Sequence, residues 1–158
     1  MVGRDSELAA LLKLSTTVRA GLGRVAAIVA EPGLGKTRLI AEWKSASGES
    51  IHWIEGHCLS YGAGLAYHLL IDLLRSVLEL PSAAGESEMR AALLSRSDEL
   101  FGASAIDVYP YLGHLLSLKL EGSALERVSG LDPRALQNQY AFAWRRLLHA
   151  LAARRALG

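Results

Sequence analysis

The strongest constraint on the fold is a glycine-bearing segment that ends in a lysine and a threonine. Residues 30–37 read Ala-Glu-Pro-Gly-Leu-Gly-Lys-Thr. The general phosphate-loop pattern is Gly, four residues, Gly-Lys and then Ser or Thr, and Ala30 stands where the first glycine is expected. The segment therefore predicts a loop that wraps around phosphate groups. A glycine-rich turn before an ordinary helix is the simpler alternative.

The residues on both sides of the segment favour the phosphate loop. Residues 25–30 form a continuous apolar run, as expected of a parallel strand that is buried on both faces. After the loop, Leu39, Ile40 and Trp43 follow helical spacing. The order strand, loop and helix is the context that this motif requires, because it places the loop amides at a helix N-terminus.

The chemistry predicted for this loop is electrostatic. Backbone N–H groups from Gly33 to Thr37 would converge on phosphate oxygens, assisted by the positive end of the helix dipole. Lys36 would place its ammonium between the β and γ phosphates, and the Thr37 hydroxyl would be one ligand of Mg²⁺. Ala30 suits a turn that closes with negative φ, whereas a positive φ would disfavour any residue with a Cβ. The sequence leaves both conformations open.

Composition excludes several classes of protein. The chain has 158 residues, 51% of them hydrophobic and 21% charged, which is typical of one soluble globular domain. A net charge of +1 provides no basic surface for nucleic acid or an anionic membrane. No apolar stretch approaches the roughly 20 residues of a membrane span, and no signal peptide is evident. Cys58 is the single cysteine, which excludes an internal disulfide and fits a reducing compartment, so a cytoplasmic location is expected. Cys58 itself is interpreted as a small buried residue.

The remaining periodicity predicts an α/β fold with two strands and about six helices. Asp5 or Ser6 is expected to cap the first helix, and Gly21 and Gly23 to end it. A second strand is expected over residues 50–56. Apolar steps of three and four residues predict helices over 66–80, 86–101, 106–118 and 134–156, with Pro133 at a first helical position.

Asp72 ends an apolar run that could be mistaken for a Mg²⁺-coordinating strand. Such strands of phosphate-loop ATPases usually end in an aspartate. The apolar residues of this segment continue at helical spacing on both sides of Asp72. Asp72 is therefore predicted to lie on the solvated face of a helix.

Several motifs together resemble one family. They are residues 2–8 (Val-Gly-Arg-Asp-Ser-Glu-Leu), the phosphate loop with Arg38-Leu39, residues 56–58 and 61–62, and Leu131-Asp132-Pro133 before a long helix. The chain resembles the start of the AAA-like ATPase modules of signal-transduction ATPases with numerous domains (STAND), which include large transcription regulators and proteins with cyclase domains. This chain has His57 where the family often has arginine.

The resemblance implies an ATP-binding switch module that uses Mg²⁺. Val2 and Gly3 would lie near the adenine, and the loop would hold the triphosphate. No catalytic residue is assigned. The residues assigned to the nucleotide are Val2, Gly3, Glu31, Pro32, Gly33, Leu34, Gly35, Lys36, Thr37 and Arg38, with Thr37 also the metal ligand.

The resemblance further implies that residues 1–158 are the N-terminal part of a P-loop NTPase domain, its Walker A half. The Walker B strand would begin at Leu157-Gly158, so the sheet would be incomplete without the remainder of the parent ATPase chain, and the fragment alone would not hydrolyse ATP. Strands 24–30 and 51–57 should not be neighbours. An isolated chain would then pair them non-natively, associate with another chain, or be partly disordered.

Three classes of function fit these features. The first is nucleotide binding by a segment of a regulatory ATPase, which is the leading hypothesis. A complete small kinase should show an arginine-rich lid and an acidic strand end, and neither is evident in the sequence. The third is a helical protein-interaction module with a weakened or vestigial phosphate loop, since Ala30 and the many helical segments are compatible with it.

Overall fold

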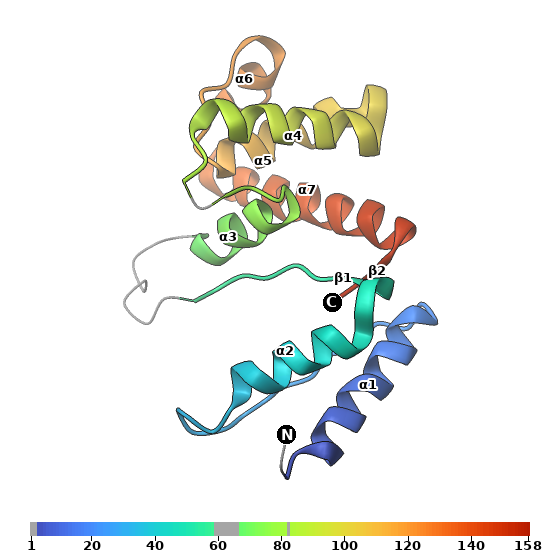
Figure 1. Cartoon of the computed structure of the whole chain (residues 1–158). Coiled ribbons are helices and arrows are strands. Elements are labelled where there is room, and N and C mark those ends of the chain that lie inside the picture. The colour runs from blue at the N-terminus through green and yellow to red at the C-terminus, as the bar shows by residue number, and fades with distance from the viewer. Residues whose placement is uncertain (1–2, 59–66, 82) are drawn as a thin grey trace. The chain divides into compact units, whose positions relative to one another are not determined.

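A computed structural model describes residues 3–58, 67–81 and 83–158, and within them the chain is mostly helical. It divides into two compact units, residues 1–53 with 152–158 and residues 54–151. The described residues contain seven α-helices and one two-stranded parallel sheet (Figure 1). This content is compatible with a partial α/β phosphate-loop fold. None of the described helices has the length and apolar character needed to cross a bilayer.

Two helices that pack against each other form most of the N-terminal unit. They are α1 (Asp5–Arg19) and α2 (Lys36–Ser47), and they bury Leu11 and Leu39. A buried polar contact links them, because the Ser15 and Ser47 hydroxyls lie 3.0 Å apart. The Trp43 indole N–H also donates to the Ser15 oxygen at 2.7 Å. A helix is present where the first one was predicted, but Asp5 is its first residue and Arg4 its N-cap, so the prediction that Asp5 or Ser6 caps it is wrong.

The sheet of this unit is much shorter than predicted. Strand β1 (Ile51–His52) runs parallel to β2 (Ala156–Leu157), with Ile51 opposite Ala156, and the Gly158 N–H donates to the His52 carbonyl at 3.0 Å. The strand predicted over residues 50–56 is therefore only two residues long, because its partner β2 also has two residues. The helix predicted over 134–156 ends at Arg154, where the chain turns into β2.

The apolar run of residues 25–30 is not a strand. These residues have no assigned secondary structure, and no strand of the described residues pairs with them. Val25 is 98% exposed and Val29 is 92% exposed. The prediction of a buried strand is wrong here because a strand is defined by its neighbours, and β1 pairs with β2 instead. The expectation that this run and β1 are not neighbours agrees with that pairing.

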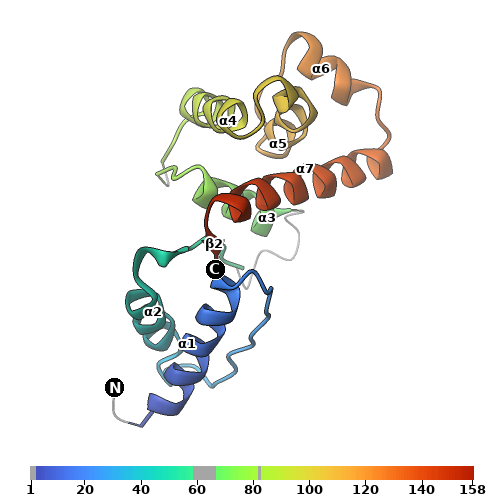
Figure 2. The same ribbon diagram turned by 90° about the vertical axis from the view of Figure 1, so that its right-hand side faces the viewer.

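The C-terminal unit is an assembly of helices (Figure 2). It contains α3 (His68–Val77), α4 (Glu86–Phe101), a 3₁₀ helix (Gly102–Asp107), α5 (Tyr109–Leu115), α6 (Gly122–Ser129) and most of α7 (Pro133–Arg154). Helix α4 packs against α5, and α5 packs against α6. The most deeply buried side chains are Leu74, Val77, Leu93, Val108, Leu112, Ala143 and Leu147.

The helical predictions for this unit are correct where periodicity is long. Helix α4 has the predicted bounds, and α7 begins at Pro133 as expected. The helix predicted over 106–118 is divided into a 3₁₀ end and α5, whose second residue is Pro110. The first N–H groups of a helix have no partner within the helix, so proline, which has no N–H, fits there at no cost. Pro110 therefore marks the start of a new helix. Helix α6 was not predicted, since its eight residues bury only Ala124 and Val128.

Gly56 passes so close to α3 that a side chain would not fit. A Cβ at this position would lie 2.6 Å from Leu73 Cγ and 2.8 Å from Leu69 Cδ1. We expect Gly56→Ala to lower the free energy of unfolding by about 1–3 kcal/mol, the usual cost of overpacking. Urea denaturation followed by circular dichroism measures it. Gly130→Ala is the matched control, because its Cβ would meet no atom within 4 Å and its φ is −92°. Equal losses in the two variants would contradict the prediction.

Candidate functional site

The segment from Ala30 to Thr37 forms a loop that leads directly into α2. The Leu34 N–H donates to the Glu31 carbonyl at 3.3 Å and closes a turn. Gly33 and Gly35 have φ angles of +83° and +78°. Only glycine adopts such angles without steric cost, so both glycines are required by the backbone path.

The conformation of Ala30 resolves the question that the sequence left open. Ala30 does not belong to the positive-φ residues of the chain. A Cβ is therefore compatible with the backbone at this position, and the departure from the glycine of the general pattern causes no strain.

The N-terminus of α2 is open to an anion. Gly35 is its N-cap residue, no side chain caps it, and its first turn contains no acidic residue. The first amides of a helix have no carbonyl partner within the helix, and the dipole adds positive potential there. A Cβ built on Gly33 or Gly35 would meet no atom within 4 Å, so the space beside the loop backbone is unoccupied by protein. This arrangement favours binding of phosphate.

The Lys36 side chain contacts the backbone at the start of the loop. Its ammonium donates to the Ala30 carbonyl and, at 3.1 Å, to the Glu31 carbonyl. Both acceptors belong to the start of the loop, so the positive charge lies beside the loop backbone. A triphosphate at the helix N-terminus would therefore be within reach of this charge.

The other predicted nucleotide residues lie around the loop or beside the N-terminus. Pro32, Leu34 and Thr37 are exposed, and Thr37 follows Lys36 in the first turn of α2. The Arg38 guanidinium pairs with Glu42 one turn later, at 3.0 Å. Gly3 lies in the turn before α1 with φ +87°, while Val2 lies outside the described residues.

The described residues contain no cluster of side chains that could bind a metal ion by themselves. No group of three or more His, Cys, Asp or Glu side chains within the described ranges could hold a metal ion. A Mg²⁺ ion at the loop would thus depend on Thr37, water and phosphate oxygens, which is how Mg²⁺ is commonly bound beside nucleotides.

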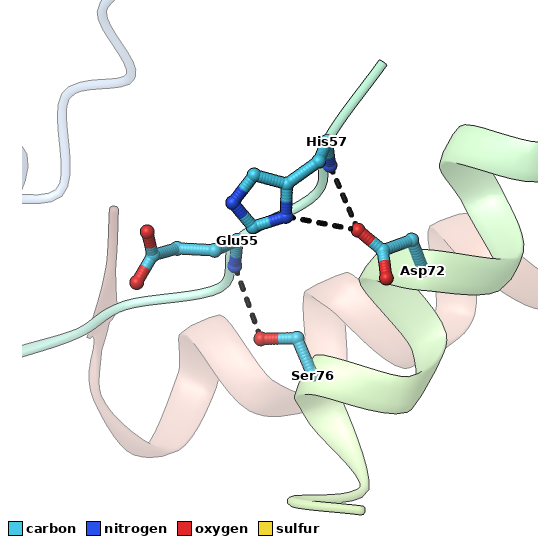
Figure 3. Close-up of polar contacts among 4 residues, drawn as sticks. All are labelled: Glu55, His57, Asp72 and Ser76. Carbon is cyan, nitrogen blue, oxygen red and sulfur yellow. Dashed lines mark hydrogen bonds and ion pairs between the residues drawn. The ribbon is translucent and has the colours of Figure 1, made fainter. Parts of the chain in front are cut away.

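A second polar cluster lies in the C-terminal unit, where residues 55–57 run along α3 (Figure 3). The Asp72 carboxylate accepts the His57 backbone N–H at 2.8 Å and contacts the His57 ring Nδ1 at 3.1 Å. One turn later, the Ser76 hydroxyl accepts the Glu55 N–H at 3.0 Å. Asp72 and Ser76 of α3 thus accept backbone N–H groups that a neighbouring strand would bind in a sheet. These residues line an open cavity of about 360 Å³.

The sequence placed Asp72 on a helix correctly but missed its role. The residue belongs to α3 and is half-buried, with its side chain 34% exposed. The hydrogen bond from the His57 backbone holds the pKa of the Asp72 carboxyl below its usual value. No sequence pattern signals a contact between residues 15 positions apart. Cys58, which follows His57 in the sequence, is exposed, which corrects the interpretation of that cysteine as buried.

This pKa shift predicts a pH-dependent contribution to stability. Because the folded-state pKa of Asp72 is lowered, its stabilising effect is complete above the unfolded value of about 3.9 and is lost as the pH falls through the folded value. We expect Asp72→Asn to lower the free energy of unfolding by about 0.5–1 kcal/mol at pH 6, a small value because solvent screens the contact. The difference from the unmodified chain should shrink toward pH 2.5 in urea denaturation. A difference that is constant with pH would contradict this.

Comparison with known proteins agrees with the loop geometry. A family model described as AAA ATPase domain matches residues 1–157. The chain is 30% identical over 155 residues to an uncharacterized protein of Rhizobium meliloti (strain 1021). The alignment covers 97% of this chain and 14% of that relative, so the chain spans about a seventh of the relative's length. No solved structure gives a significant match.

Proposed function

The chain belongs to the AAA ATPase domain family, and from this membership we propose that residues 30–37 bind the triphosphate of Mg-ATP. The observation that carries the proposal is the open start of α2, where two positive-φ glycines lead into uncapped amides and the Lys36 ammonium contacts the loop backbone. A polyanion is the ligand that such a site favours, because amide dipoles and a cation attract it together.

Each part of the loop has a distinct role in this proposal. The amides from Gly33 to Thr37 bind phosphate oxygens, and Lys36 moves its ammonium from the loop carbonyls to the β and γ phosphates. Thr37 contributes its hydroxyl to Mg²⁺. Glu31, Pro32 and Leu34 shape the loop backbone, and Arg38 follows in the first turn of α2. Gly3 would lie near the adenine together with Val2, which is outside the described residues.

The wider role is that of a switch segment in a regulatory ATPase. We propose that residues 1–158 are the Walker A half of a domain whose Walker B strand belongs to the remainder of the parent chain. The segment then binds nucleotide without hydrolysing it, since hydrolysis requires a group that positions the attacking water. A cytoplasmic STAND protein in signal transduction or transcription regulation is the context that we propose for it.

The proposal is tested by calorimetric titration with three Mg²⁺-loaded ligands. ATP and inorganic tripolyphosphate should both bind, because the loop recognises the phosphate chain. AMP should bind at least about tenfold more weakly, since it lacks the phosphates that Lys36 contacts, and one charged hydrogen bond contributes about 1.5–3 kcal/mol. Equal affinity for ATP and AMP would contradict the proposal.

The alternative of a helical interaction module is not favoured. It rested on the many helical segments and on a loop weakened by Ala30, and the backbone at Ala30 has no need of glycine. Membership of an ATPase family also favours nucleotide binding over that alternative.

A further inference from the structure

A small network of buried polar side chains joins α1 to α2. Ser15 of α1 is 2% exposed, and its hydroxyl oxygen accepts the Trp43 indole N–H at 2.7 Å. The Ser47 hydroxyl lies 3.0 Å from the same oxygen, and the Leu11 carbonyl lies 3.4 Å from it. When Ser47 donates to Ser15 and Ser15 donates to the Leu11 carbonyl, the Ser15 hydroxyl uses its one donor and both of its lone pairs. A satisfied buried network of this kind holds the two helices in one arrangement.

The contacts also show that the two helices run in the same direction. Ser15 of α1 contacts Ser47, the last residue of α2. One turn later along α1, the Arg19 guanidinium donates to the hydroxyl of Ser50, which lies just beyond the end of α2, at 3.3 Å. Because both contacts advance together along the two helices, α1 and α2 begin at the same end of the N-terminal unit, at the lower end in Figure 1.

The starts of these helices carry the two parts of the proposed nucleotide site. Gly3 lies just before α1, and the phosphate loop leads into α2 at Lys36. Ser15 follows the start of α1 by about 15 Å of helix, and Trp43 follows the start of α2 by about 10 Å. A rotation of α1 by about 10° at the network would therefore move its start by about 2–3 Å relative to the loop. Binding sites hold their groups to within about 0.5 Å, so this displacement would misalign a ligand that contacts both starts.

We propose that the network of Ser15, Trp43 and Ser47 positions the start of α1 relative to the phosphate loop, so that one Mg-ATP contacts both. This role rests on the proposed function, which puts the adenine near Gly3 and the triphosphate at the loop. The three side chains lie too far along the helices to contact the nucleotide, so they act through the helix alignment. A ligand held by the loop alone does not need that alignment. The network thus gives the site a preference for a nucleoside triphosphate over inorganic triphosphate.

Calorimetric titration of the whole chain with Mg-ATP and with Mg-tripolyphosphate tests this role. Ser15→Ala removes the acceptor of the Trp43 N–H, and it should lower the affinity for Mg-ATP about five- to tenfold. The affinity for Mg-tripolyphosphate should stay within about twofold, because the loop is unchanged. Ser45→Ala is the matched control, since it removes an exposed hydroxyl from α2 and should leave both affinities as they are.

Two further variants distinguish positioning from a general loosening of the unit. Trp43→Phe removes the same hydrogen bond from its other side, so Ser15→Ala combined with it should weaken Mg-ATP binding little more than either change alone. Ser15→Thr keeps the hydroxyl and should retain the affinity for Mg-ATP within about threefold. Ser15 lines a cavity of about 200 Å³, which leaves room for the added methyl group. Circular dichroism verifies that each variant keeps its helices.

Three outcomes would overturn the proposal while leaving the phosphate loop in place. Equal loss of affinity for the two ligands in Ser15→Ala would show that the network only stabilises the fold of the unit. An unchanged affinity for both would show that the helix alignment does not depend on it. Equal binding of ATP and tripolyphosphate by the unmodified chain would show that the start of α1 adds nothing. An unmodified chain that binds neither ligand would overturn the proposed function, and this role with it.

Discussion

Replacing Lys36 with alanine should reduce the affinity for Mg-ATP by about 100-fold or more. The lysine would make charge-assisted hydrogen bonds to two phosphates, and each contributes about 1.5–3 kcal/mol. It also ties the Ala30 and Glu31 carbonyls together in the absence of nucleotide, so its loss loosens the loop as well. Isothermal titration calorimetry measures the change directly.

Two further variants make this result specific. Lys36→Met keeps an apolar side chain of similar length and removes the charge, so it should bind as weakly as the alanine variant. Lys13→Ala removes an exposed lysine of α1 and should bind Mg-ATP normally. If Lys36→Ala and Lys13→Ala bound Mg-ATP with equal affinity, the loop would have no part in nucleotide binding.

Replacing Leu112 with alanine should have the largest effect on stability. Leu112 is fully buried in α5, in the core of the C-terminal unit. Removing its branched end leaves a cavity, and such changes cost about 2–5 kcal/mol. Urea denaturation at neutral pH, followed by circular dichroism, should therefore show the midpoint of the helical transition moving to markedly lower denaturant.

Leu125→Ala is the matched control for this change. Leu125 belongs to α6 and is 47% exposed, so the same substitution removes fewer contacts and should cost less than about 1 kcal/mol. The comparison isolates burial, because both residues lie on short helices of one unit. Equal losses in the two variants would show that Leu112 is not part of the core described.

Local patterns predicted those features that depend on neighbouring residues in the sequence. The sixteen residues of α4 have the predicted bounds, and Pro133 begins α7. The loop also leads into a helix as predicted, although no strand is assigned before it, because glycine and helix-start preferences act over a few residues. The site was therefore predictable as a backbone path, including the positions of Gly33 and Gly35.

The features that sequence could not predict depend on distant partners. The run from Val25 to Val29 has every local property of a buried strand, yet it lacks a neighbour within the described residues. The length of β1 is set by Ala156 and Leu157, a hundred residues later. Similarly, the contact between Asp72 and the His57 backbone requires the chain to fold back against α3, and periodicity carries no information about that.

Amide NMR shifts test most directly whether the backbone around residues 33–37 binds a triphosphate. Titration of ¹⁵N-labelled chain with Mg-ATP should shift the amide signals of Gly33, Gly35, Lys36 and Thr37 in one saturable transition. The same signals should not respond to Mg-ATP in the Lys36→Met variant. Loop amides that stay unchanged at millimolar Mg-ATP, or shifts confined to other parts of the chain, would contradict the account.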